Sequence, residues 1–330
     1  MTTGARQVAV LIAAHNAAAT LERAIRSALA EAETSEVIVV DDASSDTTRQ
    51  LAEAEGARDP RVRVIGLDNN VGPGEARNIA LGSATALYVA ILDSDDMFLP
   101  GRLGALLKAA EWDLVADNIA FVTAEQRDRM ASRPPPTGAE RFRPLTPEAF
   151  VRGNLRQRNT ARGELGFLKP LMSRDFLSRH GLRYDPALRL GEDYDLYTRA
   201  LLAGARMKVT SRPGYLSVVR NQSLSARHTG HDLAQLHDAI ERHLASGPMA
   251  PDLRRAMLQH LAEVRMKRDH RRFLDLKREQ GPRSALGYAL ADPRRPWPLA
   301  RDILRDKLGP DRGSALGKDG VRLLLPGGDT

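Results

Sequence analysis

The sequence predicts an α/β fold in which a mostly parallel central sheet carries helices on both faces. Short apolar runs, typical of strands that are buried on both sides, recur along the first third of the chain. Segments with the period of a helix separate these runs. Because a strand–helix–strand unit places its strands parallel and its helix against the sheet, this alternation indicates layers of helices around one sheet.

Four strands and three helices are expected in the first third of the chain. VAVLIAA and EVIVV are continuous apolar runs, whereas RVRVIGL alternates like a strand nearer to a sheet edge. Thr20 begins an amphipathic helix, and both DDASSDTT and the Gly/Pro loop NNVGPG lead into another. The expected strands are residues 8–14, 36–40, 61–67 and 86–93.

The rest of the chain is less regular and then becomes helical. MKVTS and YLSVV are expected to be two closing strands, and the pattern is helical from His231 to about Gln280. We therefore expect an α/β domain over 1–230 and a basic helical C-terminal region over 231–330. Between the first third and the closing strands we expect a strand over 113–122, a Pro-rich loop or flap over 131–147, a short strand and helix over 166–181, and a helix over 191–205.

Composition excludes several classes of protein. The chain has 330 residues and no cysteine, which excludes disulfides, thiolate metal sites and cysteine nucleophiles. It contains no apolar stretch long enough to span a bilayer, and its first residues lead directly into a strand rather than a secretion signal. We expect a cytoplasmic protein.

The positive charge is confined to the C-terminal region. Residues 251–330 contain 18 Lys/Arg and 11 Asp/Glu, whereas residues 1–250 contain 31 of each. A basic region of this kind can contact an anionic membrane surface, and the basic helix 257–280 is the candidate segment. Packing against the α/β domain, also within a dimer, is the alternative. We expect no binding to nucleic acid.

Acidic residues follow the predicted strands at their carboxyl ends, where open α/β sheets bind ligands. Asp93, Asp95 and Asp96 follow the fourth strand, and Asp41 and Asp42 follow the second. Two carboxylates that are two residues apart can converge on one divalent cation, and oxygen ligands suit Mg²⁺ or Mn²⁺. Capping of the next helix remains an alternative for each group.

Three further segments are candidate site elements. The loop NVGPGEAR, with Arg77, could bind phosphate, although it matches neither dinucleotide nor Walker A loops and could be a plain turn into a helix. Glu192 and Asp193 begin a helix, where one carboxylate could act as a general base or simply favour the helix dipole. His228 is a candidate third metal ligand, although a lone histidine is more often structural.

Taken together and in this order, the segments resemble the family 2 glycosyltransferases, which have the Rossmann-like GT-A fold. The resemblance covers about residues 6–227 and ends with SLS at 223–225. LVADN and LGFLKP are similar to the bacterial enzymes that build succinoglycan-type exopolysaccharides. The segments that carry the resemblance are VAVLIAAHNAAATLERAIRSAL, EVIVVDDASSDTT, NNVGPGEARNIAL, ILDSDDMF and GEDYDL.

The resemblance implies a role for each matching residue. Residues 1–112 would bind the nucleotide sugar and residues 113–230 the acceptor. Asp193 matches the general base, with Glu192 on the acceptor side, and Asp95 matches the metal-binding acid. His15 stands where the family often has Tyr, which could stack on uracil, and an imidazole ring can also stack there. The positions that match nucleotide-sugar contacts are Ala13, His15, Asp42, Arg77, Asp93 and Ser94.

The implied reaction is an inverting, Mn²⁺- or Mg²⁺-dependent glycosyl transfer. The donor would be a UDP-sugar, with UDP-glucose as the first candidate. The acceptor would be a hydroxyl of a saccharide or of a polyprenyl-diphosphate-linked saccharide, in exopolysaccharide or cell-surface polysaccharide synthesis. Two enzymatic alternatives are a sugar-phosphate nucleotidylyltransferase and an NAD-dependent dehydrogenase. Both would have a glycine-rich loop after the first strand, where this chain has AAHNAAAT. The third alternative is a non-catalytic nucleotide-sugar-binding or scaffold protein.

Overall fold

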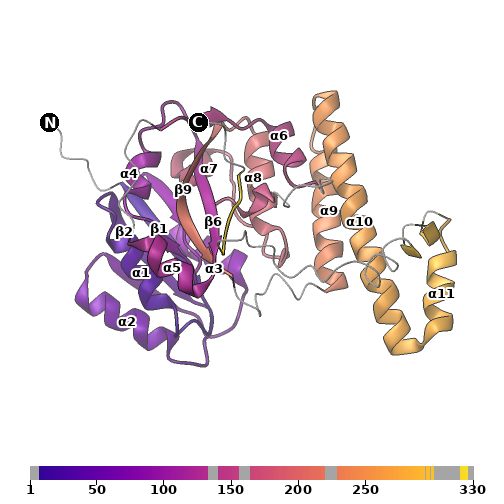
Figure 1. Cartoon of the computed structure of the whole chain (residues 1–330), viewed down its shortest axis with the longest axis horizontal. Coiled ribbons are helices and arrows are strands. Elements are labelled where there is room, and N and C mark those ends of the chain that lie inside the picture. The colour runs from indigo at the N-terminus through magenta and orange to yellow at the C-terminus, as the bar shows by residue number, and fades with distance from the viewer. Residues whose placement is uncertain are drawn as a thin grey trace.

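The computed structural model describes residues 7–132, 140–155, 164–219, 229–293, 295–297, 299–300 and 320–325. Its centre is a sheet with the strand order β3-β2-β1-β4-β8-β6-β9-β5, and β7 and β10 pair with β9 and β6. Helices surround the sheet, and two long helices stand beside it (Figure 1). This arrangement confirms the predicted α/β architecture.

The first half of the sheet is parallel and follows the expected strands. β1 pairs with β2 on one side and with β4 on the other, and β2 pairs with β3, all in parallel. Ala14 lies opposite Asp41, which lies opposite Gly66, so the carboxyl ends of these strands form one edge. The strands are β1 (Val8–Ala14), β2 (Thr34–Asp41), β3 (Val62–Gly66) and β4 (Tyr88–Ile91).

Helices cover both faces of this half. The helices α1 (Leu21–Leu29) and α2 (Thr48–Arg58) pack on each other, and α3 (Pro73–Ser83) packs on β1 and β2. The chain moves outward from β1 to β3 and then returns to β4, on the other side of β1. Because crossovers are right-handed, this reversal places α3 on the face opposite α1 and α2.

The second half of the sheet is mixed. β8 (Leu171–Ser173) runs antiparallel to both of its neighbours, β4 and β6 (Leu114–Val122), and β6 runs parallel to β9 (Met207–Val218). β1, β2, β3, β4, β6 and β9 therefore share one direction, and the sheet is mostly parallel. The remaining strands of this part are β5 (Met97–Phe98) and β7 (Arg143–Pro144).

The two expected closing strands form the single strand β9. Its pairing with β6 shifts register on both sides of Asn118, which lies opposite Pro213. A bulge at this point accommodates a proline, which cannot donate a ladder hydrogen bond, without ending the strand. The helices of this half are α4 (Arg102–Leu106), α5 (Ala124–Ala131), α6 (Pro147–Arg152), the 3₁₀ helix η1 (Leu165–Phe167), α7 (Arg174–Arg179) and α8 (Glu192–Leu202).

The described part of the C-terminal region is mainly helical, as expected. α9 (Gly230–Ala245) and α10 (Pro251–Gln280) lie side by side and pack on α8 and α6, and α11 (Pro282–Leu290) folds back on α10, far from the sheet (Figure 1). The short strand β10 (Val321–Leu323), which the helical pattern did not predict, pairs with β6. None of the helices within the described residues is long and apolar enough to cross a bilayer.

Candidate active site

The carboxyl ends of β1 and β2 bring the first group of predicted residues together. The Asp42 carboxylate accepts hydrogen bonds from the backbone N–H groups of Val71 (2.7 Å) and Gly72 (2.9 Å). Nδ1 of His15, which follows Ala13 at the end of β1, lies 2.7 Å from the backbone oxygen of Asp42. Asp42 thus fixes the glycine loop that leads into α3, and Gly72 has the positive φ of 86° that favours glycine there.

The second group is a buried cluster around Arg77. The guanidinium of Arg77, on α3, donates to Asp93 at the end of β4 (2.7 Å). It also donates to Glu192 (3.1 Å) and Asp193 (3.4 Å), in the first turn of α8. The Arg77 guanidinium therefore joins carboxylates that lie on opposite sides of the site.

Lys169 completes this cluster from the segment before β8. Its Nζ lies 2.7 Å from Asp193 Oδ2 and 3.0 Å from Asp93 Oδ2. The hydroxyl of Tyr184 donates to Asp193 Oδ1 at 3.0 Å. The sequence analysis assigned no role to Lys169 or Tyr184, and the available signal was a lysine enclosed by apolar residues in GFLKPLM.

The positive charges of Arg77 and Lys169 determine the ionisation of the acidic residues in this cluster. Burial alone would raise the pKa of Asp93, but the charges of Lys169 and Arg77 outweigh it and hold this pKa well below its usual range. Burial would likewise lower the pKa of Lys169, but Asp193 and Asp93 raise it above its usual value. The pKa of Glu192 is raised by burial and by the neighbouring charge of Asp193.

Asp96 contacts another strand of the sheet. Its carboxylate accepts a hydrogen bond from the backbone N–H of Val218 on β9 at 3.1 Å. Burial, together with the charges of Asp93 and Asp95, raises its pKa well above the usual value. The backbone N–H of Asp93 donates to the hydroxyl of Tyr215, also on β9, at 3.0 Å. These two contacts fix the acidic turn after β4 against β9.

Comparison with known proteins decides the family. Residues 9–167 match the family model of glycosyl transferase family 2. The "Succinoglycan biosynthesis protein ExoU" of Rhizobium meliloti (strain 1021) is 44% identical to this chain, over 96% of the chain and 95% of ExoU. The chain belongs to glycosyltransferase family 2. The similarity to ExoU also confirms the expected succinoglycan-type subgroup.

Solved structures confirm the GT-A fold of this family 2 glycosyltransferase. S. aureus TarS 1-349 in complex with UDP-GlcNAc has a TM-score of 0.58 and 18% identity, over 91% of this chain and 81% of that one. The mannosyltransferase PcManGT from Pyrobaculum calidifontis, in complex with GDP-Man and Mn²⁺, has a TM-score of 0.56 and 17% identity, over 94% and 82%. At this level of identity the likeness concerns the fold alone.

The acidic turn of the family 2 glycosyltransferase is suited to a divalent cation at Asp95. Mg²⁺-type sites commonly use one or two carboxylates together with substrate phosphates and water. Asp93, Ser94 and Asp95 are all half-buried, and the oxygens of Asp93 contact Lys169 and Arg77. Asp95 remains the predicted ligand of such a cation. His228, the other candidate ligand, and the SLS segment lie outside the described residues.

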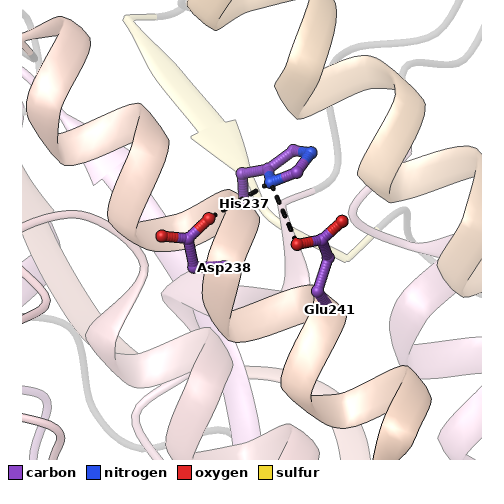
Figure 2. Close-up of side chains that lie close together, drawn as sticks. All are labelled: His237, Asp238 and Glu241. Carbon is purple, nitrogen blue, oxygen red and sulfur yellow. Dashed lines mark hydrogen bonds and ion pairs between the residues drawn. The ribbon is translucent and has the colours of Figure 1, made fainter.

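A second acidic group lies on α9, far along the chain from these residues. Figure 2 shows His237 with Asp238 and Glu241 beside it, and its Nδ1 lies 3.4 Å from Asp238 Oδ1 and 3.8 Å from Glu241 Oε2. Arg265 and Arg268 line the pocket next to His237 and Glu241. Their positive charge opposes a cation, so ion pairing along one helix explains this group.

Proposed function

We propose that this glycosyltransferase transfers the sugar of a UDP-sugar, with UDP-glucose as the first candidate, to a saccharide hydroxyl with inversion. The acceptor is a saccharide or a polyprenyl-diphosphate-linked saccharide. The observation that carries the proposal is the pair Asp93 and Asp193, which Arg77 and Lys169 join across the site. Asp93 matches a nucleotide-sugar contact and Asp193 matches the general base. The same two side chains thus contact a residue of the donor side and the proposed base.

The proposed pathway follows from the similarity to ExoU. ExoU is named as a succinoglycan biosynthesis protein, and its similarity extends over nearly the full length of both chains. This supports a role in exopolysaccharide or cell-surface polysaccharide synthesis. The ligands of TarS and PcManGT support a nucleotide-sugar donor and a divalent cation. Family membership leaves the nucleotidylyltransferase and dehydrogenase alternatives without support.

Asp193 is the proposed general base. Its carboxylate receives three donors, from Lys169, Arg77 and Tyr184. A carboxylate offers about four lone-pair sites, so one site remains for the acceptor hydroxyl. Glu192, one residue away, is the proposed acceptor-side residue. Because Lys169 and Tyr184 hold opposite oxygens, the orientation of the Asp193 carboxylate is fixed before the substrate arrives.

The proposed reaction is a single displacement at the anomeric carbon. The acceptor oxygen forms a bond to this carbon while the bond to the diphosphate oxygen breaks, and the electron pair leaves with the diphosphate. The hydroxyl proton passes to Asp193. A cation at Asp95 would offset the negative charge that develops on the diphosphate. An α-linked donor therefore gives a β-linked product.

A donor screen tests this proposal. UDP-sugars are incubated with Mn²⁺, with and without EDTA, and nucleotide release is followed. We expect turnover of one UDP-sugar, its loss in EDTA, and a β-linkage in the product by NMR. Turnover that is unaffected by EDTA, or an α-linked product, contradicts the metal-dependent, inverting reaction.

The Asp193→Asn variant tests the base. We expect it to bind UDP and Mn²⁺ as the wild type does, while turnover falls by about 100-fold or more because no group accepts the proton. Asp175→Asn, an exposed ion-pair member on α7, is the matched control and should retain full activity. Full turnover in Asp193→Asn removes this residue from the base role.

A further inference from the structure

Exposed apolar side chains are concentrated on α10, α11 and the segment that follows them. Among the described residues, nine large hydrophobic side chains are exposed, and five of them lie between residues 258 and 297. The most exposed of these five are Trp297 (79%), Leu290 (64%) and Leu286 (57%). A soluble surface normally scatters such residues singly, so their concentration indicates a contact surface.

The leucines of α11 are turned away from the protein. Ala285 and Ala289, four residues apart, are buried in the contact between α11 and α10. Leu286 and Leu290, also four residues apart, share another face of the same helix and are exposed. The small residues thus make the internal contact, and the large apolar residues face outward.

A polar network holds α11 in this orientation. The hydroxyl of Tyr288 donates to Asp269 on α10 at 3.0 Å, and Arg295 lies over the Tyr288 ring at 4.2 Å. Arg265 donates to Asp292, just after α11, at 2.7 Å. The outward face is therefore presented by a helix that is fixed at both its middle and its end.

The hairpin that carries this apolar face is basic. Residues 251–290, which form α10 and α11, contain 10 Lys/Arg and 5 Asp/Glu, whereas residues 1–250 are balanced. The exposed basic residues nearest the turn between the two helices are Arg271, Arg272, Lys277, Arg278 and Arg283. An apolar helix face on a basic hairpin is complementary to anionic headgroups over a hydrocarbon layer.

We propose that the hairpin of α10 and α11 docks on an anionic lipid surface. Leu286, Leu290 and Trp297 enter the boundary between headgroups and acyl chains, and the basic residues contact the headgroups. Docking of this kind requires the apolar side chains, whereas electrostatic attraction by the basic helix 257–280 alone does not. It does not depend on the donor or base proposed above, so its test is separate. A lipid-linked acceptor would lie at the same surface.

Vesicle sedimentation of the full chain tests the proposal. Phosphatidylcholine vesicles with and without phosphatidylglycerol are compared for the wild type and a Leu286→Ser, Leu290→Ser, Trp297→Ser variant. We expect the wild type to pellet with the anionic vesicles and the variant to bind about tenfold more weakly or worse. Leu87→Ser, at an equally exposed leucine (61%) next to β4, is the matched control and should bind as the wild type does.

Trp297 provides an independent readout. The chain has two tryptophans, and Trp112 packs on Tyr88 in the body. In a Trp112→Phe background, we expect the emission of Trp297 to shift to shorter wavelength on anionic vesicles. Unchanged emission, or undiminished pelleting of the triple variant, overturns the proposal. Self-association without vesicles that the triple variant abolishes, with no pelleting of the wild type, assigns the surface to a second copy and also overturns it.

Discussion

Lys169 places one ammonium group between two carboxylates from distant parts of the chain. It contacts Asp93 at the end of β4 and Asp193 at the start of α8, and its own side chain is almost fully buried. A buried charge is tolerated only when it is paired. The charge balance of the site therefore depends on Lys169 as much as on the acids that it joins.

Lys169→Met is expected to lower turnover by about 100-fold, because Asp193 loses the partner that orients Oδ2. The measurement is kcat with the UDP-sugar found in the donor screen. Lys208→Met is the matched control, since Nζ of Lys208 donates at the surface to the Ala110 backbone oxygen, its one hydrogen-bond partner within the described residues. Equal activity of the two variants contradicts a positioning role for Lys169.

The sequence identifies most of these residues singly but not their convergence. Arg77 and Asp193 were separate candidates, and they are 116 positions apart in the chain. The local signal at Lys169 is a lysine within an apolar segment, and without a charge pattern around it this signal does not indicate its partners. Asp96 was predicted at most to cap a turn, because its partner Val218 lies on a strand that joins the sheet 122 positions later.

At the scale of elements, β6 is the strand on which the second half of the sheet depends. β8 pairs with its beginning, β10 with its end, and β9 with its other side along most of its length. Asn118, in its middle, is fully buried. Its amide nitrogen donates to the backbone oxygens of Leu325 (2.9 Å) and Ser211 (3.0 Å), and its oxygen accepts from the Leu325 N–H (2.8 Å).

Asn118→Ala is expected to lower the free energy of unfolding by about 2–4 kcal/mol, since it leaves buried backbone groups of Leu325 and Ser211 without partners. Urea denaturation measures this change, and hydrogen exchange should show faster exchange at β10. Asn70→Ala removes one exposed amide contact and should change stability by less than about 0.5 kcal/mol. A similar small effect for Asn118→Ala would mean that β10 is not held by this side chain.

The elements of the first half were predictable because each has a local signal. Continuous apolar runs and N-cap residues mark β1, β2 and the helices between them. β9 was split into two strands because Pro213 and Gly214 interrupt its pattern, and only pairing with β6 shows that it continues. β10 was missed because three residues carry no period, and their partner lies about 200 positions earlier in the chain.

At the scale of the whole molecule, a buried hydrogen bond connects the C-terminal helices to the body. Asp195 Oδ1, on α8, lies 2.9 Å from Nε2 of His243 on α9, and Arg199 donates to Oδ2 at 2.6 Å. Burial would raise the pKa of Asp195, but the hydrogen bonds from His243 and Arg199 outweigh it and lower this pKa. The contact between α8, in the α/β domain, and α9, in the C-terminal region, is therefore sensitive to pH.

Asp195→Asn is expected to lower the free energy of unfolding by about 3 kcal/mol at neutral pH. Because the pKa of Asp195 is lower in the folded state than in the unfolded state, its stabilisation is present above about pH 4 and is lost as the pH falls further. The difference between wild type and variant should therefore shrink in acid. Urea denaturation over a pH series checks this, with Asp175→Asn as the exposed control; a difference independent of pH contradicts it.

The strand β10 also has a consequence for the order in which the protein is made. Asn118 and its partner Leu325 are 207 positions apart. At about 5–20 residues per second, a ribosome delivers the second on the order of 10–40 s after the first. After β9 has paired with β6 and until β10 is made, the final residues of β6 have one unpaired edge, and open strand edges recruit other chains. Release of the newly made enzyme in an assembled form therefore depends on a segment that lies outside the matched family region, 9–167.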